Sequence, residues 1–317
     1  MKQITHNSSP SHAKGFSLVE LMVAMLLGLI LVGAATGVML SNTQSFKATQ
    51  KIAQTQDGAR LGFELMARDI RQAGSIPCGN NTSIDNIISA AQSDAPWYLD
   101  WGVDEKDPLV GHAKNTILAD LNNRADDTEA LTVLYADNSG TSLADANTIH
   151  NNADKFSTGD IAFLCEGNHA SIFKATIEDQ RITASESADT NTTTMFGDFK
   201  KNAVLSKLKS RAWYIGKNTQ GGRSLYLAEL TNIKTTEKKP LKQHIQLIEI
   251  TSGVIDLRFE YHLKGANNFI KVGEVGDQWP LVNAIKITLV LLDEEQPEDS
   301  KKLTHFSSIV AVRNQSL

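Results

Sequence analysis

The sequence of 317 residues contains very little cysteine, which excludes two kinds of stabilised fold. Its two cysteines, Cys78 and Cys165, are too few for a zinc site built from four thiolates or for a dense disulfide framework. The chain can form at most one internal disulfide bond.

An excess of positive charge is also missing. Lys and Arg total 31 against 36 Asp and Glu, so the formal net charge is -5. Proteins that hold nucleic acid need a basic surface for the phosphates, and we therefore expect no nucleic acid as a partner of this chain. The hydrophobic fraction of 41% is ordinary for a chain with a packed core.

Common catalytic and ligand-binding motifs are missing as well. The sequence has no Gly-x-Ser-x-Gly, Gly-x-Gly-x-x-Gly, Walker or His-Glu-x-x-His motif. Six histidines after residue 15 lack the spacing of metal ligands: His112, His150, His169, His244, His262 and His305. Asp126, Asp127 and Glu129 are candidate calcium ligands, but they do not form an EF-hand loop. We expect no enzymatic activity, no metal and no cofactor, and we assign no catalytic residue.

One long hydrophobic run lies near the amino terminus. Residues 21–40 contain no charged side chain, and a helix of this length is about 30 Å long, the thickness of a bilayer's hydrocarbon. A cleaved secretory signal would have a shorter apolar run followed by small residues, whereas here the small residues lie inside the run. The run predicts a membrane-spanning helix, and a secretory signal is the less favoured alternative.

Glu20 lies just before this run, where a carboxylate needs a partner because burying it in a membrane costs up to about 3 kcal/mol. The string KGFSLVEL, residues 14–21, resembles the processing site of type IV prepilins and the related pseudopilins. In that family a peptidase cleaves after the glycine on the cytoplasmic face and methylates the new amino terminus. The resemblance implies removal of a leader, residues 1–15, by cleavage after Gly15, and N-methylation of Phe16.

The same resemblance implies an assembly role for Glu20. In pilins, the partner of this glutamate is the amino group at the start of a neighbouring subunit, which is cationic at neutral pH. Such a pair compensates both charges in the low dielectric of a filament core and fixes the axial stagger of the helices. The alternative is a glutamate at the membrane interface that faces lipid headgroups.

The residues after the run predict an amphipathic continuation of the helix over 41–74. Apolar residues recur along one stripe: Phe46, Ala53, Ala59, Phe63, Met66, Ile70 and Ala73. Charged residues occupy the opposite face. Gly74, with Pro77 close behind, predicts the end of the helix.

Nine apolar runs separated by polar turns predict an antiparallel β-sheet domain. They are ALTVLYA, DIAFLCE, ASIFKATI, RAWYIG, SLYLAEL, HIQLIEI, VIDLRFEYH, NAIKITLVLLD and HFSSIVAV, from residue 130 onward. Leu257, Phe259 and Tyr261 alternate with polar residues, which predicts one buried face. Residues 285–292 predict a central strand that is apolar on both faces.

Three loop features complete the expected domain. Gly221 and Gly222 predict a hairpin, and residues 183–195 predict a surface excursion without an apolar face. Before the first strand, the sequence has no sustained periodicity. There we expect the aromatic residues to anchor the loop in the core; they are Trp97, Tyr98 and Trp101.

The fold class we expect is α+β and type IV pilin-like, with a long amino-terminal helix packed on an antiparallel sheet domain. Its parts are a cleaved leader (1–15), a transmembrane or filament-core helix (16–40), an amphipathic continuation (41–74) and an extracytoplasmic β-rich domain (75–317). Because disulfides persist outside the cytoplasm, we expect a bond between Cys78 and Cys165. The alternative is two buried thiols.

Several segments together resemble PilW-type minor pilins more loosely: GDIAFLCEG, ASIFKATI, RAWYIG, SLYLAEL, LIEITSGVIDLRFEYH and FSSIVAVRN. This implies a minor pilin that primes or caps a type IV pilus and supports pilus biogenesis, adhesion, twitching motility or DNA uptake. One alternative is a pseudopilin of a type II secretion system. Long pseudopilins that cap the secretion filament tend to lack the glutamate, so Glu20 favours the pilus. A membrane-anchored periplasmic enzyme or binding protein is the third reading.

The resemblance also implies partners and a location. The partners are other minor pilins, the major pilin, the prepilin peptidase, the inner-membrane assembly platform and a tip adhesin. The location is the bacterial inner membrane, crossed once, with the carboxy-terminal domain in the periplasm, and later the pilus on the cell surface.

Overall fold

The computed structural model describes most of the chain, in segments: residues 15–79, 83–88, 96–102, 107–137, 140–145, 148–149, 155–178, 181–184, 203–233, 242–292 and 303–313. The chain forms two compact units, Met1–Ala53 and Gln54–Leu317. The second unit contains the sheets and the hydrophobic core.

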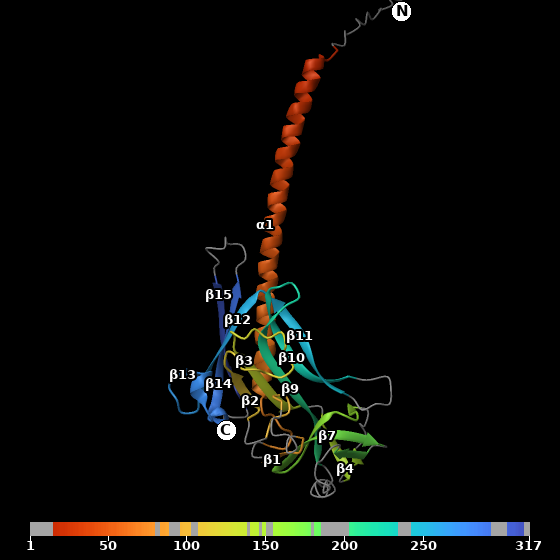
Figure 1. The fold of residues 1–317 in the computed structure, drawn as a ribbon, viewed down its shortest axis with the longest axis vertical. Coiled ribbons are helices and arrows are strands. Elements are labelled where there is room, and N and C mark those ends of the chain that lie inside the picture. Colours follow the sequence, from red (N-terminus) through yellow and green to blue (C-terminus); the bar gives the residue numbers. More distant parts are fainter. Residues whose placement is uncertain are drawn as a thin grey trace, which may run out of the picture. The chain divides into compact units, whose positions relative to one another are not determined.

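A single helix, α1 (Leu18–Gln72), contains 55 residues and includes residues of both units (Figure 1). It ends as predicted. Gly74 has a φ of +65°, in the left-handed region that favours glycine, and its N–H donates to the carbonyl of Leu134 at 2.9 Å. The end of α1 is thereby tied to the first predicted strand of the domain.

Strands in the second unit form two sheets (Figure 1). The 11-stranded sheet has the order β1-β7-β8-β5-β4-β9-β10-β11, with β2 on β3, β3 on β9, and β6 between β7 and β9. Its strands are β1 (Ser83–Asn86), β2 (Leu109–His112), β3 (Ala130–Ala136), β4 (Thr141–Asp145), β5 (Thr148–Ile149), β6 (Ile161–Glu166), β7 (His169–Glu178), β8 (Arg181–Ala184), β9 (Val204–Lys217), β10 (Arg223–Ile233) and β11 (Lys242–Ser252).

The second sheet has four strands in the order β13-β12-β14-β15. They are β12 (Val254–Leu263), β13 (Phe269–Lys271), β14 (Val282–Leu292) and β15 (Leu303–Ala311), with the short helices α3 (Val272–Val275) and η3 (Trp279–Leu281) between β13 and β14. All nine predicted runs are strands, so the prediction of an α+β, pilin-like fold is confirmed. The pairing is antiparallel as predicted, except between β1 and β7, which run parallel.

The predicted hairpin joins β9 and β10. Gly221 has a φ of +81°, and the side-chain oxygen of Asn218 accepts the backbone N–H groups of Gln220 at 3.0 Å and Gly222 at 2.9 Å. This turn aligns β10 on β9, with Tyr214 opposite Tyr226 and their rings stacked at 5.7 Å.

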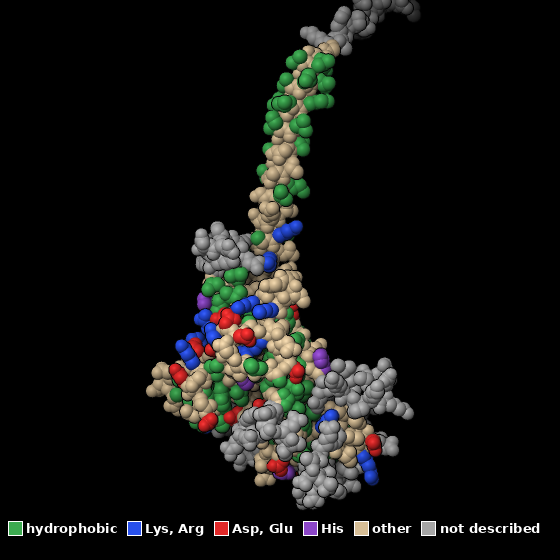
Figure 2. All heavy atoms as spheres, viewed as in Figure 1, with side chains coloured by type: hydrophobic (Ala, Val, Ile, Leu, Met, Phe, Trp, Pro, Cys, Tyr) green, Lys and Arg blue, Asp and Glu red, His purple; other side chains and the backbone are tan. Residues whose placement is uncertain are grey.

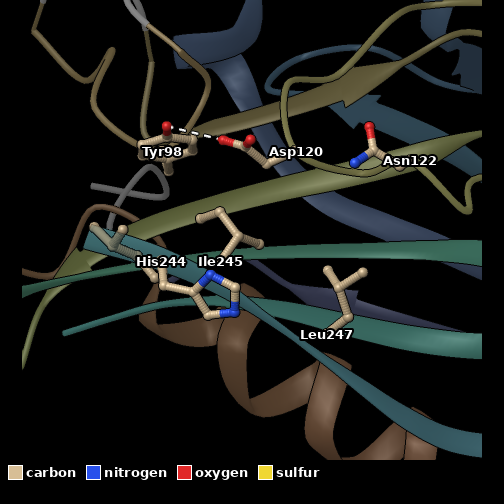
Figure 3. Close-up of a pocket in the computed structure, with 7 residues that line it drawn as sticks. Tyr98, Asp120, Asn122, His244, Ile245 and Leu247 are labelled. Atoms are coloured by element: carbon tan, nitrogen blue, oxygen red, sulfur yellow. Dashed lines mark hydrogen bonds between the residues drawn. The ribbon is translucent and has the colours of Figure 1, made fainter. Parts of the chain in front are cut away.

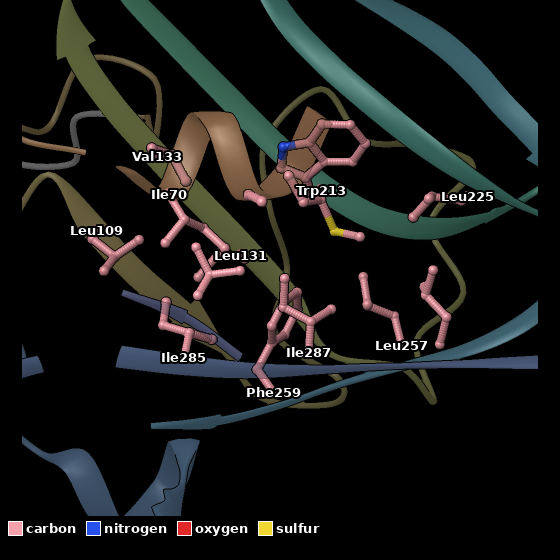
Figure 4. Close-up of a cluster of buried hydrophobic side chains, with 14 of the residues drawn as sticks. Ile70, Leu109, Leu131, Val133, Trp213, Leu225, Leu257, Phe259, Ile285 and Ile287 are labelled. Carbon is pink, nitrogen blue, oxygen red and sulfur yellow. The ribbon is translucent and has the colours of Figure 1, made fainter. Parts of the chain in front are cut away.

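The main hydrophobic core contains side chains from the carboxy-terminal part of α1 and from both sheets (Figure 4). Met66 and Ile70 of α1 join Trp213 of β9 and Phe259 of β12 in it, all fully or almost fully buried. The amphipathic prediction is therefore right from Ala59 onward.

The predicted stripe is wrong at its beginning. Phe46 is 69% exposed and Ala53 is exposed. Both belong to the first unit, where a single helix offers no second surface that could bury them.

The four-stranded sheet confirms one pattern and corrects another. Leu257, Phe259 and Tyr261 are buried, as their alternation predicts. β14 is a central strand of its sheet, as predicted. Up to Leu289, however, its residues mostly alternate between buried and partly buried, and only from Leu289 onward are both faces of the strand apolar and largely buried. Lys286 lies on the less buried face of this strand and pairs with Glu260 at 2.6 Å.

A second core cluster lies under the loop before β2. Trp97 and Trp101 are each 5% exposed, and Trp101 stacks on Phe163 at 5.5 Å, which confirms the predicted anchoring. Of the predicted surface excursion, residues 183–184 belong to β8 and the rest lie outside the described residues.

His112 of β2 makes the stability of the fold depend on pH. Its Nε2 lies 2.9 Å from Oγ1 of Thr132, and burial, together with the charge of Arg124, lowers the pKa of His112 to about 4. An unfolded histidine has a pKa of about 6.5, so between these values the unfolded chain binds a proton that the folded chain does not. The free energy of unfolding should fall as the pH drops through this window, by at most about 3 kcal/mol.

We expect the variant His112→Gln to lose this part of the pH dependence. Urea denaturation of the full chain at pH 7, 5.5 and 4 measures it. His305→Gln, an exposed histidine of β15, is the matched control and should keep the wild-type slope. Equal slopes for wild type and His112→Gln would contradict the assignment.

Candidate assembly site

The residues around the predicted cleavage site lie at the very start of α1. Gly15 and Phe16 precede the helix, and Phe16 is 85% exposed. Glu20 belongs to the first helical turn and is exposed. A carboxylate in this position is favoured by the positive end of the helix dipole.

The helix after Glu20 presents an uncovered apolar surface (Figure 2). Large hydrophobic side chains between Leu18 and Leu40 are all more than half exposed. By length and composition α1 can cross a membrane. An apolar surface of this extent needs lipid or other helices around it.

A threonine and two glycines make this part of α1 compatible both with lipid and with packing against other helices. The hydroxyl of Thr36 donates to the backbone carbonyl of Val32, so it needs no other partner in hydrocarbon. Gly33 and Gly37 lie one turn apart, and a side-chain carbon added at either would meet open space. Together they leave a shallow surface that the backbone of a second helix can approach closely.

Comparison with known families identifies this part of the chain. The prokaryotic N-terminal methylation motif matches residues 10–36, which include Gly15, Phe16 and Glu20. The protein is type IV pilin-like. No curated protein and no solved structure matches the chain. The motif and the apolar start of α1 make this pilin-like protein membrane-anchored.

The pilin-like protein contains the predicted disulfide bond. Cys78 and Cys165 are bonded, with their Cα atoms 6.0 Å apart, which confirms the pairing. Cys165 lies in β6 opposite Ala170 of β7, and Ile84 of β1 also pairs with Ala170. The bond therefore holds the segment after α1 against β6, next to the strand β7 with which β1 pairs.

Two of the three candidate calcium ligands make other contacts through their side chains. Asp127 pairs with Arg223 at 2.9 Å, and Oε2 of Glu129 accepts the backbone N–H of Phe259 at 2.7 Å. Within the described segments, no group of three His, Cys, Asp or Glu side chains is arranged to hold a metal ion. His150 lies outside these segments.

Sequence reasoning missed a buried ion pair that attaches α1 to the 11-stranded sheet. Asp69 of α1 is fully buried. Arg211 Nη1 donates to its Oδ1 at 2.6 Å, and Trp213 Nε1 donates to its Oδ2 at 2.9 Å. A signal was present, because Asp69 lies on the apolar stripe, three residues after Met66.

The ion pair extends to the neighbouring strand. Arg211 also donates to Glu229 of β10 at 3.3 Å, and Lys209 pairs with the same carboxylate at 3.0 Å. Burial raises the pKa of Asp69, while Arg211 and Trp213 act in the opposite direction. For Glu229, burial is outweighed by Arg211 and Lys209, which hold its pKa below the usual value. Arg211 thus joins α1, β9 and β10 through two carboxylates.

Removing the carboxylate of α1 should destabilise the second unit. We expect Asp69→Ala to lower the free energy of unfolding by about 3 kcal/mol, because it leaves a buried guanidinium without one of its partners. Breaking a buried ion pair costs about 3 to 5 kcal/mol. We expect the lower value here because Arg211 keeps its contact with the carboxylate of Glu229. Urea denaturation of the full chain in detergent measures it, with the exposed Glu64→Ala of the same helix as control. Equal stability of the two variants would contradict the prediction.

Proposed function

We propose that this pilin-like protein is a PilW-type minor pilin, a structural subunit that primes or caps a type IV pilus. The observation that carries the proposal is the methylation motif at the start of a helix whose large apolar side chains, between Leu18 and Leu40, are all more than half exposed. In the proposed maturation, residues 1–15 are removed after Gly15 and the amino group of Phe16 is methylated.

The assembly step follows from the chemistry of these groups. Glu20 pairs with the amino group of Phe16 on a neighbouring pilin, and the two charges compensate each other as the helices leave the lipid and pack together. The uncovered apolar side chains then lie against other pilin helices. The domain beginning near residue 75 is periplasmic in the membrane-anchored state and surface-exposed in the pilus.

Its partners in this role are the major pilin, other minor pilins, the prepilin peptidase and the inner-membrane assembly platform, with a tip adhesin in a priming complex. Adhesion, twitching motility or DNA uptake is the activity that the fibre then supports. The presence of Glu20 in a chain of this length favours the pilus over a type II secretion filament.

The variant Glu20→Ala tests the proposed pairing. We expect its leader to be removed normally, because Glu20 follows the cleavage site, and its amount in sheared surface filaments to fall at least about tenfold. This factor corresponds to losing about 1.4 kcal/mol, a modest fraction of the cost of leaving the partner amine unpaired. The measurement is quantitative immunoblotting of filament and membrane fractions.

Glu64→Ala is the matched control, because Glu64 is an exposed acid of the same helix that pairs with Arg60 at 3.9 Å. It should leave filament incorporation unchanged. Normal incorporation of Glu20→Ala would contradict charge pairing. Deleting the protein from the cell distinguishes a role in a type IV pilus from a role in type II secretion. Loss of pili supports the proposal, and normal piliation with blocked protein secretion contradicts it.

A further inference from the structure

The outer edge of β11 is an open end of the 11-stranded sheet. β11 pairs with β10 along Lys242–Ser252 and ends the sheet order, and its other edge forms no ladder with any described strand. Native proteins commonly protect such edges with proline, several lysines or a covering segment. β11 contains no proline and a single lysine, and within the described segments no strand pairs with the backbone groups of this edge.

A groove of about 470 Å³ runs beside this edge (Figure 3). Its apolar part comes from Leu230 of β10 and from Ile245 and Leu247 of β11, and Leu247 is 38% exposed. The remaining lining residues are polar: Tyr98, Asp120, Asn122 and His244.

The polar wall of the groove is held in place by hydrogen bonds. Trp97 Nε1 donates to the carbonyl of Ala119 at 2.9 Å, and the hydroxyl of Tyr98 donates to Oδ2 of Asp120 at 3.0 Å. The guanidinium of Arg124 donates to three carbonyls of the same loop, those of Ala113, Thr116 and Thr128. Because Asp120 is already positioned, a ligand that binds it loses little free energy to ordering the loop.

The charges beside β11 favour a cationic ligand. Asp120 is exposed at the groove, and Glu249 projects from the same face of β11 as Leu247, with its Oε1 accepting the hydroxyl of Ser224 at 2.7 Å. Neither Lys nor Arg is among the described residues that line the groove. The carboxylates of Asp120 and Glu249 therefore favour a positive side chain, and the apolar part favours an aliphatic one beside it.

We propose that β11 binds an extended peptide segment of a partner protein, which adds a strand to the sheet edge and places a Lys or Arg side chain against Asp120. Backbone hydrogen bonds along β11 supply the affinity, and the groove supplies the side-chain preference. This occupant uses both features, whereas a saccharide would use the groove and leave the strand edge unpaired. The proposal depends on the second unit alone and is independent of the methylation motif.

Three fluorescent nine-residue peptides test it against the full chain in detergent micelles. The first alternates Thr and Val around a central Lys, the second has a central Asp, and the third is the Lys peptide with a methylated backbone nitrogen at alternate residues. In fluorescence anisotropy, we expect the Lys peptide to bind at least about fivefold more tightly than the Asp peptide, the size of a modest ion pair. Backbone methylation should abolish binding, because it removes the donors that face the sheet edge.

Two variants and a second measurement complete the test. Asp120→Asn keeps an acceptor for Tyr98 and should weaken the Lys peptide about fivefold, while Asp277→Asn, an exposed acid near α3, should not. Hydrogen exchange of residues 242–252 should slow when the Lys peptide binds. Equal affinity for all three peptides, no effect of Asp120→Asn, no protection of β11, or binding of neutral oligosaccharides in place of the peptides would each overturn the proposal.

Discussion

Substituting Gly15 by Val is expected to stop maturation and leave the full precursor in the membrane. The peptidase of the resembled family cleaves after a glycine, and we expect a branched side chain at this position to block its approach to the peptide bond. The structure separates this effect from misfolding, because a side-chain carbon added at Gly15 meets no atom within 4 Å.

Mass spectrometry of the membrane-purified protein measures the effect. The wild type should begin at N-methylated Phe16, whereas Gly15→Val should retain residues 1–15 in essentially every molecule. Gly28→Ala is the matched control, because Gly28 also lies in open space within the methylation motif and Ala favours helix. A mature Gly15→Val chain that begins at Phe16 would contradict the assigned cleavage site.

Removing the disulfide bond should have the largest effect on the stability of the second unit. The bond links residues 87 apart, and closing a loop of this length is worth about 4 to 5 kcal/mol through the lost freedom of the unfolded chain. We expect the double variant Cys78→Ala/Cys165→Ala to lose stability of this order. Alanine is chosen because Cys165 is fully buried, where a serine hydroxyl would add a cost of its own.

Urea denaturation with and without reductant provides the internal control. The wild type should lose stability in the presence of reductant and approach the double variant, which should not respond to it. Hydrogen exchange should show the loss first in the segment after α1 and in β1, which depends on β7 for its pairing. Wild-type stability that is insensitive to a reductant shown to cleave the bond would contradict the prediction.

Much of this architecture follows from residue patterns with a simple period. The nine strands were predictable because each has enough apolar residues to indicate a buried face, and Gly74 was predictable as a helix end because only glycine adopts its backbone angles easily. The short strands β5 and β13 were not, since two or three residues cannot show an alternation. The contacts of Asp69 with Arg211 and Trp213 also escaped prediction, because they join residues more than 140 positions apart.

The candidate assembly site and the groove beside β11 differ in the same respect. Gly15, Phe16 and Glu20 form a local motif that can be read directly from the sequence. The groove beside β11 brings Asp120 next to Leu247 through the path of the 11-stranded sheet and a long loop, which no local pattern encodes.

The position of Cys78 also limits how far the chain can lengthen under tension. Only residues 73–77 separate the end of α1 from the bond to Cys165. If a force on the amino-terminal helix unfolds this short connection, the disulfide bond transmits the force directly to β6. The segment enclosed by the bond, about 300 Å if fully extended, contributes nothing to the stretch. The oxidised chain therefore resists a mechanical load with a much shorter extensible length than the reduced chain.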